Sequence, residues 1–440
     1  MNIKRFFERA KERGIDQSQI SVSKSSSTSV SLFHHEIDSF GVETSQSVLA
    51  CGIYNGKMGA CRTERFDKDT FDFLIDGIID SASTTERPNE VGIFEGSKKY
   101  KRGSTWNKEL STIPLSKKID DIRTIENRLF ESKVGITEVE SVYYSEVNFE
   151  SEFYNSFGLK LKSKSNYYAI SAGVVGQDEG KPRTAFSVAF GSDYSAFKMD
   201  EFIKDIEDKL IGKFGGTQIK SGKYKTVLKN SVFASLLNYF LSNLSSEEVQ
   251  KHSSFLIGKL GKQVASKKVT IEERPLDKNI FFSYFDGEGV AKKNKLLIDK
   301  GVLKTYLYNR ETAAKEGVET TGNARLAGNK MVVENDQVRV KASKKEFKDL
   351  IKGVKKGVFI TDIQGLGTGM NAQSGDFSCQ AQGFSIVDGK IDKPLTLITL
   401  SGNLLQMLGD VQGFDNQLEL SLSGVACANV LIKKMSIGGE

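Results

Sequence analysis

Alternation of apolar and polar side chains is the feature that most limits how this 440-residue chain can fold. It runs through residues 20–64 and resumes through about 137–192, and turn-forming residues separate the runs in each stretch. A period of two residues is typical of β-strands with one buried face. Each stretch is followed by apolar residues at helical spacing, at 68–82 and at 198–213, so the sequence predicts groups of strands closed by helices.

The two strand-rich stretches are predicted to be copies of one unit. Ile37-Asp38-Ser39-Phe40-Gly41-Val42 matches Tyr154-Asn155-Ser156-Phe157-Gly158-Leu159, and each match precedes a hairpin and one helix. The predicted fold class is α+β, with duplicated N-terminal hairpin-plus-helix units followed by a large C-terminal antiparallel or mixed sheet domain with packed helices. The predicted domains are residues 1–100, 114–215 and 222–440.

Four cysteines are too few for a disulfide scaffold in a chain of this length. Two of them flank Asn55-Gly56, a dipeptide that favours a two-residue hairpin turn. Counting outward from that turn places Cys51 opposite Ala60 and Cys61 opposite Ala50. The two sulfurs then lie on opposite faces of the hairpin, so we expect neither a disulfide nor a shared metal site.

Composition narrows the class of protein further. Hydrophobic residues make up 38% and charged residues 27% of the chain, which is typical of a globular protein rather than a disordered one. No apolar run is long enough to span a membrane, and the N-terminus has no signal-peptide pattern. The net charge of +6 is mostly scattered Lys without interleaved aromatic residues, so nucleic acid is not an expected partner. We expect a cytoplasmic protein.

Histidine is scarce, which limits the possible metal chemistry. Only His34, His35 and His252 occur, and a catalytic zinc site needs about three protein ligands. Adjacent residues on a strand point to opposite faces, so His34 and His35 are not expected to share an ion. The sequence therefore assigns no catalytic residue and no metal ligand.

Three polar clusters in the last third of the chain are candidates for a substrate groove. Each places Gly beside a hydrogen-bonding side chain at the end of a strand-like run, an arrangement that can hold an extended peptide by its backbone. Ordinary turns with side-chain-to-backbone hydrogen bonds are the alternative. The candidate residues are Thr321, Asn323, Arg325, Ser374, Asp376 and Asn403.

At these clusters the sequence resembles the TldD/TldE family of peptidases, once called modulators of DNA gyrase, and within it the PmbA (TldE) branch. The resemblance covers nearly the whole chain, and the order and spacing of its pieces make it specific. The strongest stretches are residues 253–273, 285–290, 297–317, 321–325, 374–394, 398–408 and 430–439.

The resemblance implies a two-subunit metalloprotease that cuts unfolded peptides. In the TldD-type subunit an HExxxH helix supplies two zinc-binding His and a general-base Glu. That helix would fall within residues 236–244, where Leu237 and Ser242 stand near the His positions and Asn238 near the Glu position. None of the three suits those roles, and Cys427 does not align with the family's ligand Cys. No cofactor is therefore expected in this chain, and zinc is expected in the partner subunit.

Three functional hypotheses follow. The first is a non-catalytic subunit that pairs, through its C-terminal region, with a zinc-bearing TldD-type subunit in a heterodimer and helps to hold an unfolded peptide. The alternative is a stand-alone homodimeric peptide-binding or regulatory protein without a protease role. A third is an enzyme with a Ser/Lys or acid-pair site, although no spacing in the sequence singles out such a pair.

Overall fold

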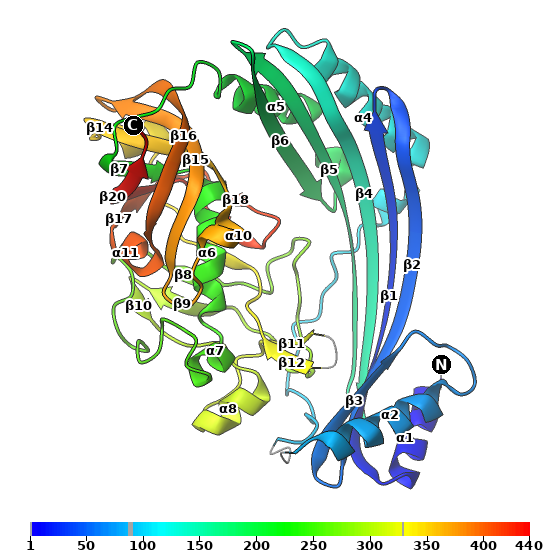
Figure 1. Cartoon of the computed structure of the whole chain (residues 1–440). Helices are drawn as coiled ribbons and strands as arrows, with labels where there is room; N and C mark the ends of the chain where they lie inside the picture. Colours follow the sequence, from blue (N-terminus) through cyan, green and yellow to red (C-terminus); the bar gives the residue numbers. More distant parts are fainter. Residues whose placement is uncertain (1, 87–90, 328–329) are drawn as a thin grey trace.

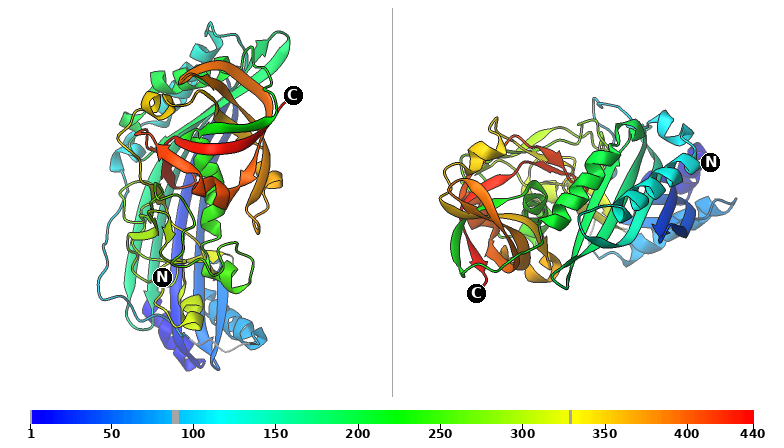
Figure 2. Two further views of the ribbon diagram at one scale, coloured as in Figure 1. Left: turned by 90° about the vertical axis from the view of Figure 1, so that its left-hand side faces the viewer. Right: turned by 90° about the horizontal axis from the view of Figure 1, so that it is seen from above.

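The computed structural model describes residues 2–86, 91–327 and 330–440; residues 87–90, which fall in the first predicted domain, and 328–329 lie outside the described chain. A curved sheet of long strands faces a second half built from shorter strands and helices (Figure 1). In the left view of Figure 2 the long strands run behind the C-terminal half. The predicted α+β class is confirmed. None of the helices in the described ranges has the length and apolar character to cross a membrane.

The N-terminal half contains one six-stranded antiparallel sheet in the order β3-β2-β1-β4-β5-β6. Four of its strands are 19 or 20 residues long, so the sheet is much longer than it is wide. The strands are β1 (Ile15–Phe33), β2 (Glu36–Tyr54), β3 (Lys57–Thr63), β4 (Ile136–Asn155), β5 (Lys160–Asp178) and β6 (Lys181–Gly191).

The sheet consists of two copies of one arrangement, as predicted. Each copy is a helix, three antiparallel strands and a second helix, and β1 pairs with β4 to join the copies. The matched hexapeptides lie at different points, however, because 37–42 is inside β2 whereas 154–159 ends β4 and forms the following turn. The repeat is therefore evident from the order of the helices and strands and not from the short sequence match. The helices are α1 (Ile3–Glu12), α2 (Thr70–Thr84), α4 (Leu115–Phe130) and α5 (Met199–Ile211).

All four helices cover the same face of the sheet, at its two ends. Ile20 and Val22 of β1 belong to the apolar cluster under α1 and α2, and Val30 and Leu32 to the cluster under α4 and α5. Because side chains alternate along a strand, the odd-numbered residues of β1 face the opposite side. From residue 21 to residue 31 every one of these odd positions is Ser.

The Asn55-Gly56 turn forms as predicted. Both residues have positive φ, 49° and 71°, as this tight turn requires. Cys51 is opposite Ala60 and Cys61 is opposite Ala50, so the predicted register is confirmed and both cysteines are free.

The expectation that His34 and His35 lie on a strand is wrong. They form the two-residue turn between β1 and β2, and both have positive φ, 51° and 67°. His34 Nε2 lies 2.7 Å from Glu138 Oε1, and the backbone N–H of His35 donates to Glu126 Oε2 at 3.0 Å. His tolerates the left-handed region better than branched residues do, and here it ends a hairpin next to carboxylates.

The C-terminal half holds two six-stranded mixed sheets instead of one large one. The first has the order β16-β15-β14-β7-β20-β17, and β16 also pairs with β20, so five strands close into a ring. The second has the order β10-β9-β8-β13-β19-β18. The strands of the first sheet are β7 (Gly222–Leu228), β14 (Lys356–Gln364), β15 (Asp376–Val387), β16 (Lys390–Asn403), β17 (Val411–Phe414) and β20 (Val430–Gly438). Those of the second are β8 (Ile271–Glu273), β9 (Lys295–Asp299), β10 (Val302–Leu303), β13 (Val338–Val340), β18 (Glu419–Leu420) and β19 (Val425–Cys427).

Helix α6 (Asn230–Ser242) runs through the middle of this half (Figure 1). Its Leu236, Leu237 and Phe240 are fully buried, and they belong to one apolar cluster that includes residues of both sheets. A separate hairpin of β11 (Ala324–Ala327) and β12 (Lys330–Val333) extends toward the N-terminal sheet. The remaining helices are α3 (Lys108–Thr112), η1 (Tyr194–Ala196), α7 (Ser246–Gln250), α8 (Arg310–Glu316), α9 (Phe347–Ile351), α10 (Leu366–Gly369) and α11 (Leu404–Gly409).

A buried acidic turn connects the two halves. Tyr100 Oη donates to the carbonyl of Gly289 at 2.7 Å, and the Arg310 guanidinium donates to the carbonyls of residues 91 and 92. Asp286 accepts hydrogen bonds from three backbone N–H groups, at 2.9–3.0 Å, and Glu288 accepts one from the N–H of Arg310. Burial raises the pKa of Asp286 to about 6, and burial together with the nearby Asp286 raises that of Glu288 to about 7.

The contact of β3 with α2 predicts a strong effect of Gly59→Ala. A Cβ on Gly59 would lie 1.9 Å from the carbonyl oxygen of Ile78, so the helix must move away from the strand. We expect a loss of about 1–3 kcal/mol in the free energy of unfolding, measured by urea denaturation. Gly367→Ala is the control, since nothing lies within 4 Å of its added Cβ. Equal stability of the two variants would contradict the close packing.

The acidic turn predicts a pH-dependent stability. Because the pKa values of Asp286 and Glu288 are raised above the ordinary value near 4, the folded chain binds more protons than the unfolded chain between about pH 4 and pH 7. The free energy of unfolding therefore falls as the pH rises through this window. Glu288→Gln should lose less stability than the unmodified protein between pH 5 and pH 8, in urea denaturation at both pH values. Glu319→Gln, at an exposed site, should retain the original slope; identical slopes for all three proteins would refute this origin.

Candidate functional site

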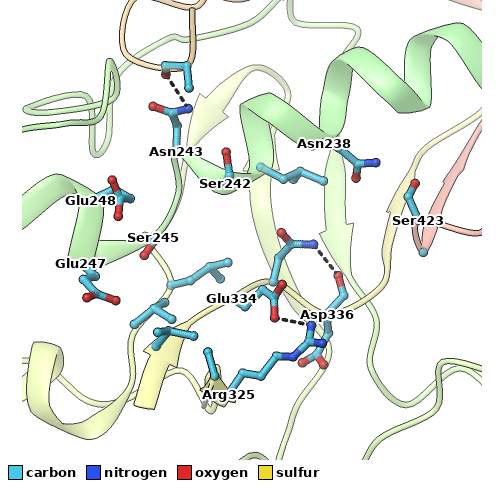
Figure 3. Close-up of a pocket in the computed structure, with 18 of the residues that line it drawn as sticks. Asn238, Ser242, Asn243, Ser245, Glu247, Glu248, Arg325, Glu334, Asp336 and Ser423 are labelled. Carbon is cyan, nitrogen blue, oxygen red and sulfur yellow. Dashed lines mark hydrogen bonds and ion pairs between the residues drawn. The ribbon is translucent and has the colours of Figure 1, made fainter. Parts of the chain in front are cut away.

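A cleft of about 1190 Å³ opens beside the C-terminal end of α6. Its walls come from α6 and α7, from the β11–β12 hairpin with the segment 334–337 that follows it, and from the turn at 422–424. Figure 3 shows side chains from these separate segments directed into one space. The cleft therefore depends on the tertiary fold and not on a local motif.

Helix α6 presents polar but uncharged side chains to the cleft. Asn238, Ser242 and Asn243 line it, whereas Leu237 is fully buried in the apolar core. Asn243 Nδ2 donates to the carbonyl of Ala372 at 3.1 Å and so fixes one edge of the cleft. Amides and a hydroxyl can hydrogen-bond to a peptide backbone.

Several of the charged side chains in the cleft form ion pairs. Glu247 of α7 lies 2.8 Å from Lys251 Nζ and 2.9 Å from Lys330 Nζ of β12. Burial alone would raise the pKa of Glu247, but the hydrogen bonds from the two lysines lower it, so the carboxylate stays charged. The pair with Lys330 also connects α7 to the hairpin across the cleft.

Of the six predicted groove residues, only Arg325 lines this cleft. It lies on β11, with its side chain 68% exposed, and forms an ion pair with Glu334. Figure 3 shows the two side chains joined by a dashed line. An exposed guanidinium at this position can bind a carbonyl or carboxylate of a ligand.

Thr321 and Asn323 hold the base of the hairpin that carries Arg325. Thr321 Oγ1 donates to Asn323 Oδ1 at 2.8 Å, and Asn323 Nδ2 donates to Glu273 Oε1 at 2.8 Å. Glu273 is fully buried and pairs with Lys295, whose Nζ also donates to Asn323 Oδ1 at 2.9 Å. Asn323 is itself only 2% exposed, and its four partners occupy its side chain. Its place in the structure is that of a support for the cleft wall.

Ser374, Asp376 and Asn403 form a separate local cluster. Asn403 Nδ2 donates to the carbonyl of Ser374 and to Asp376 Oδ1, both at 2.9 Å. Asn403 Oδ1 also accepts from the first N–H groups of α11, so this side chain caps the helix. Hydrogen bonds from Asn403 and then Ser374 lower the pKa of Asp376. The structure brings these three residues together but away from Thr321, Asn323 and Arg325.

A second cavity of about 500 Å³ lies between the β11–β12 hairpin and the N-terminal sheet. It shares Arg325, Glu334 and Asp336 with the first cleft, so the hairpin forms a wall of both. Its opposite wall is the serine-bearing face of the long sheet. The serines that line it are Ser21, Ser23, Ser47, Ser151 and Ser163.

The sequence reasoning missed two groups of cleft residues. Glu247 and Lys330 belong to no recognisable sequence motif. They are 83 residues apart in the sequence, and only the fold brings them together. The serine-bearing face had a signal, because Ser recurs at every second position of residues 21–31, where a helix-covered face would carry apolar residues.

The donor set of α6 does not fit the zinc ion that the resemblance associates with this helix. Leu237, Asn238 and Ser242 offer neither imidazole nor carboxylate. Within residues 2–86, 91–327 and 330–440, no three or more His, Cys, Asp or Glu side chains are grouped to hold a metal ion. Cys427 lies beside the start of α6, but its Sγ contacts the carbonyl of Asn230 at 3.1 Å, and burial raises its pKa to about 12.

Known proteins are similar to this chain in sequence and fold. The family profile of the PmbA/TldA metallopeptidase central domain matches residues 108–214, and that of the C-terminal domain matches residues 221–439. The metalloprotease PmbA of Escherichia coli O157:H7 is 23% identical over 430 residues, which cover 97% of this chain and 93% of the relative.

Solved structures agree over nearly the whole chain. A protein described as a modulator of a DNA gyrase from Thermotoga maritima superposes with a TM-score of 0.92 at 27% identity, over 99% of both chains. TldE from Thermococcus kodakarensis has the same fold, with a TM-score of 0.91 at 19% identity, over 99% of this chain and all of that one. With both family profiles matched in order along one chain and the fold shared throughout, the protein belongs to the PmbA/TldD/TldE metallopeptidase family.

Proposed function

We propose that this chain is the zinc-lacking subunit of a two-subunit metalloprotease, and that its cleft holds part of an unfolded peptide while a TldD-type partner supplies the zinc. The observation that carries the proposal is the surface of α6. The helix position associated with zinc chemistry in this family faces a cleft, yet here it presents Asn238 and Ser242 in place of a base and a ligand.

The character of the cleft supports a peptide as its occupant. Its lining mixes amides, hydroxyls and paired charges with apolar residues such as Leu241 and Val332. Such a surface can bind an extended backbone without strong preference for side chains. The sheet wall of the adjoining cavity has several serines beside Arg62, Leu49, Phe149 and Phe153, so hydrogen-bonding and apolar groups continue beyond Arg325.

We also propose a partner subunit and a cellular location for this chain. A chain with this donor set needs a second subunit for metal-dependent hydrolysis, and we propose a heterodimer formed through the C-terminal half, where the cleft lies. A cytoplasmic location is supported by four cysteines that are all unpaired.

Reconstitution of the complex tests whether the partner subunit supplies the zinc and this chain does not. The purified chain alone should hold far less than one zinc per molecule and should not cleave an unstructured peptide. Mixed with the TldD-type subunit from the same source, it should form a complex that cleaves the peptide and is inhibited by a chelator. Native mass measurement with metal analysis and a fluorogenic peptide assay give the readouts. Full activity of the partner by itself, or zinc-dependent cleavage by this chain by itself, would refute the proposal.

A substitution in the cleft tests whether this subunit contacts substrate. Arg325→Ala should raise the KM of the complex for the peptide about fivefold, with less change in kcat, because a charge-assisted contact is lost. Arg128→Ala is the matched control, since Arg128 also pairs with a carboxylate on an exposed surface but lies on α4. If both variants match the unmodified complex, the rim of this cleft does not touch substrate.

A further inference from the structure

A surface rich in lysine lies on the C-terminal half. It is formed by the loop 257–270 and by the β9–β10 hairpin, which lies on the side of this half away from the N-terminal sheet (Figure 1). Backbone hydrogen bonds join the loop to the hairpin: the N–H of Leu303 donates to the carbonyl of Lys262 at 3.0 Å, and the N–H of Gly301 donates to the carbonyl of Val269 at 2.8 Å. The fold therefore gathers lysines from two segments into one lysine surface, namely Lys259, Lys262, Lys267, Lys268, Lys300 and Lys304.

The charge of the lysine surface is not neutralised by the chain itself. Five of its six lysines are exposed and Lys259 is half-exposed, and none of them forms an ion pair with a described residue. The lysines at its borders differ, since Lys251 pairs with Glu247 and Lys295 pairs with Glu273. Asp299 is the only acidic residue within 251–270 and 295–304. Positive charges gathered without partners favour an anionic ligand.

The other side chains of this surface indicate which kind of anion fits. Segments 251–270 and 295–304, both fully described, contain no Arg and no exposed aromatic residue, which are the groups that stack on nucleic-acid bases. Ile257 and Leu260 are 40% and 49% exposed, so more than half of each is already covered. Two such side chains present too little apolar area to anchor the protein in a bilayer. They are large enough to contact single apolar side chains of a peptide.

The lysine surface adjoins the C-terminal cleft. Lys251, at one border of the surface, lines the cleft, and so does Leu307, three residues beyond Lys304. The N–H of Leu307 donates to the carbonyl of Leu244 at 2.8 Å, which fixes this strand against the end of α6. Three residues span at most about 10 Å. One extended peptide can therefore occupy the cleft and the lysine surface at the same time.

We propose that the lysine surface binds an acidic segment of an unfolded polypeptide whose neighbouring residues lie in the cleft. This inference rests on the proposed function, because it names acidic peptides as the class of substrate that this subunit recruits. Carboxylates of the peptide pair with the free ammonium groups, and apolar side chains between them contact Ile257 and Leu260. A second contact joined to the cleft raises the effective concentration of the peptide there without any change in the cleft itself.

Peptide binding by the full-length chain alone tests the surface without zinc or a partner subunit. A labelled, unstructured peptide of Glu, Leu, Gly and Ser should bind in fluorescence anisotropy, and its affinity should fall as the salt concentration rises, because exposed charge pairs are screened. The same peptide with Gln in place of every Glu should bind at least about tenfold more weakly. Equal binding of the two peptides, or no binding of the acidic one, overturns the proposal.

A triple substitution locates the binding on the chain. Lys262→Gln, Lys268→Gln and Lys304→Gln together should weaken binding of the acidic peptide about tenfold, since three exposed charge pairs are lost. The matched control neutralises three exposed lysines of the N-terminal half that also have no ion pair with a described residue, by Lys11→Gln, Lys68→Gln and Lys108→Gln. It should bind like the unmodified chain. Equal losses in the two triple variants would show that net charge, and not this surface, governs binding, and would overturn the proposal.

Two other anions are compared in the same assay. Duplex DNA and vesicles that contain phosphatidylserine should bind more weakly than the acidic peptide. Tighter binding of either one, lost in the triple variant of the lysine surface, would overturn the proposal and assign the surface to that class of partner.

Kinetics of the two-subunit complex connect the surface to substrate choice. The triple variant of the lysine surface should raise the KM about tenfold for a peptide with an acidic segment and leave the KM for an uncharged peptide unchanged, with kcat similar in both cases. An equal change for both peptides would overturn the proposal. If the complex cleaves neither peptide, the proposed function fails, whereas the binding measurements on the single chain still decide whether the lysine surface takes acidic peptides.

Discussion

The pairing of β1 with β4 is the interaction on which the rest of the N-terminal half depends. It runs without a break from Gln19–Asn155 to Leu32–Val142 and joins two units that would each be a three-stranded sheet. A three-stranded sheet of this length with both of its helices at one end would leave the other end of that face uncovered. By joining the units at their first strands, the pairing places two helices at each end of a single sheet and lets one continuous strand, β1, contribute to both apolar clusters.

Strand β1 also determines which side chains lie on the opposite face of the sheet. Ile20, Val22, Val30 and Leu32 of β1 pack into the cores, whereas the odd positions from 21 to 31, on the opposite face, are all serines. Side chains this small leave space between the sheet and the β11–β12 hairpin, which is where the second cavity lies. A row of Leu or Val at Ser21 and Ser23 would fill that space and attach the two halves more tightly. The small side chains that leave this space come from β1, β2, β4 and β5.

In the C-terminal half, α6 is held in place by its apolar side chains. Most of its surface is apolar, and Leu236, Leu237 and Phe240 pack into the core shared by both sheets. A helix that binds a catalytic metal must use one part of its surface for packing into the core and another part for the metal ligands. In this chain most of the helix packs into the core, and Asn238, Leu241 and Ser242 line the cleft.

Sequence reasoning succeeded where a few adjacent residues determine the structure. Asn55-Gly56 specified its turn, and the turn fixed the register of the hairpin around it. It failed for His34-His35, because a two-residue turn of histidines has no such distinct signature. The predicted groove residues show a different limit: an Asn beside Gly at a strand end is equally suited to binding a ligand, supporting a hairpin or capping a helix. Asn323 supports the hairpin and also lines the second cavity, and Asn403 caps α11, while their part in binding a substrate stays a prediction.

The position of the β11–β12 hairpin bears on where a substrate could lie. It is a wall of both cavities, and its base is fixed by a buried network of Asn323, Glu273 and Lys295. Burying Glu273 is costly unless its charge is paired, and Lys295 with Asn323 provides those partners. The hairpin therefore keeps a defined position at its base while Arg325 remains exposed above it. Under the proposed function, an extended peptide that passes from the serine-bearing face toward α6 would cross this hairpin, and we propose that it meets Arg325, which lines both cavities.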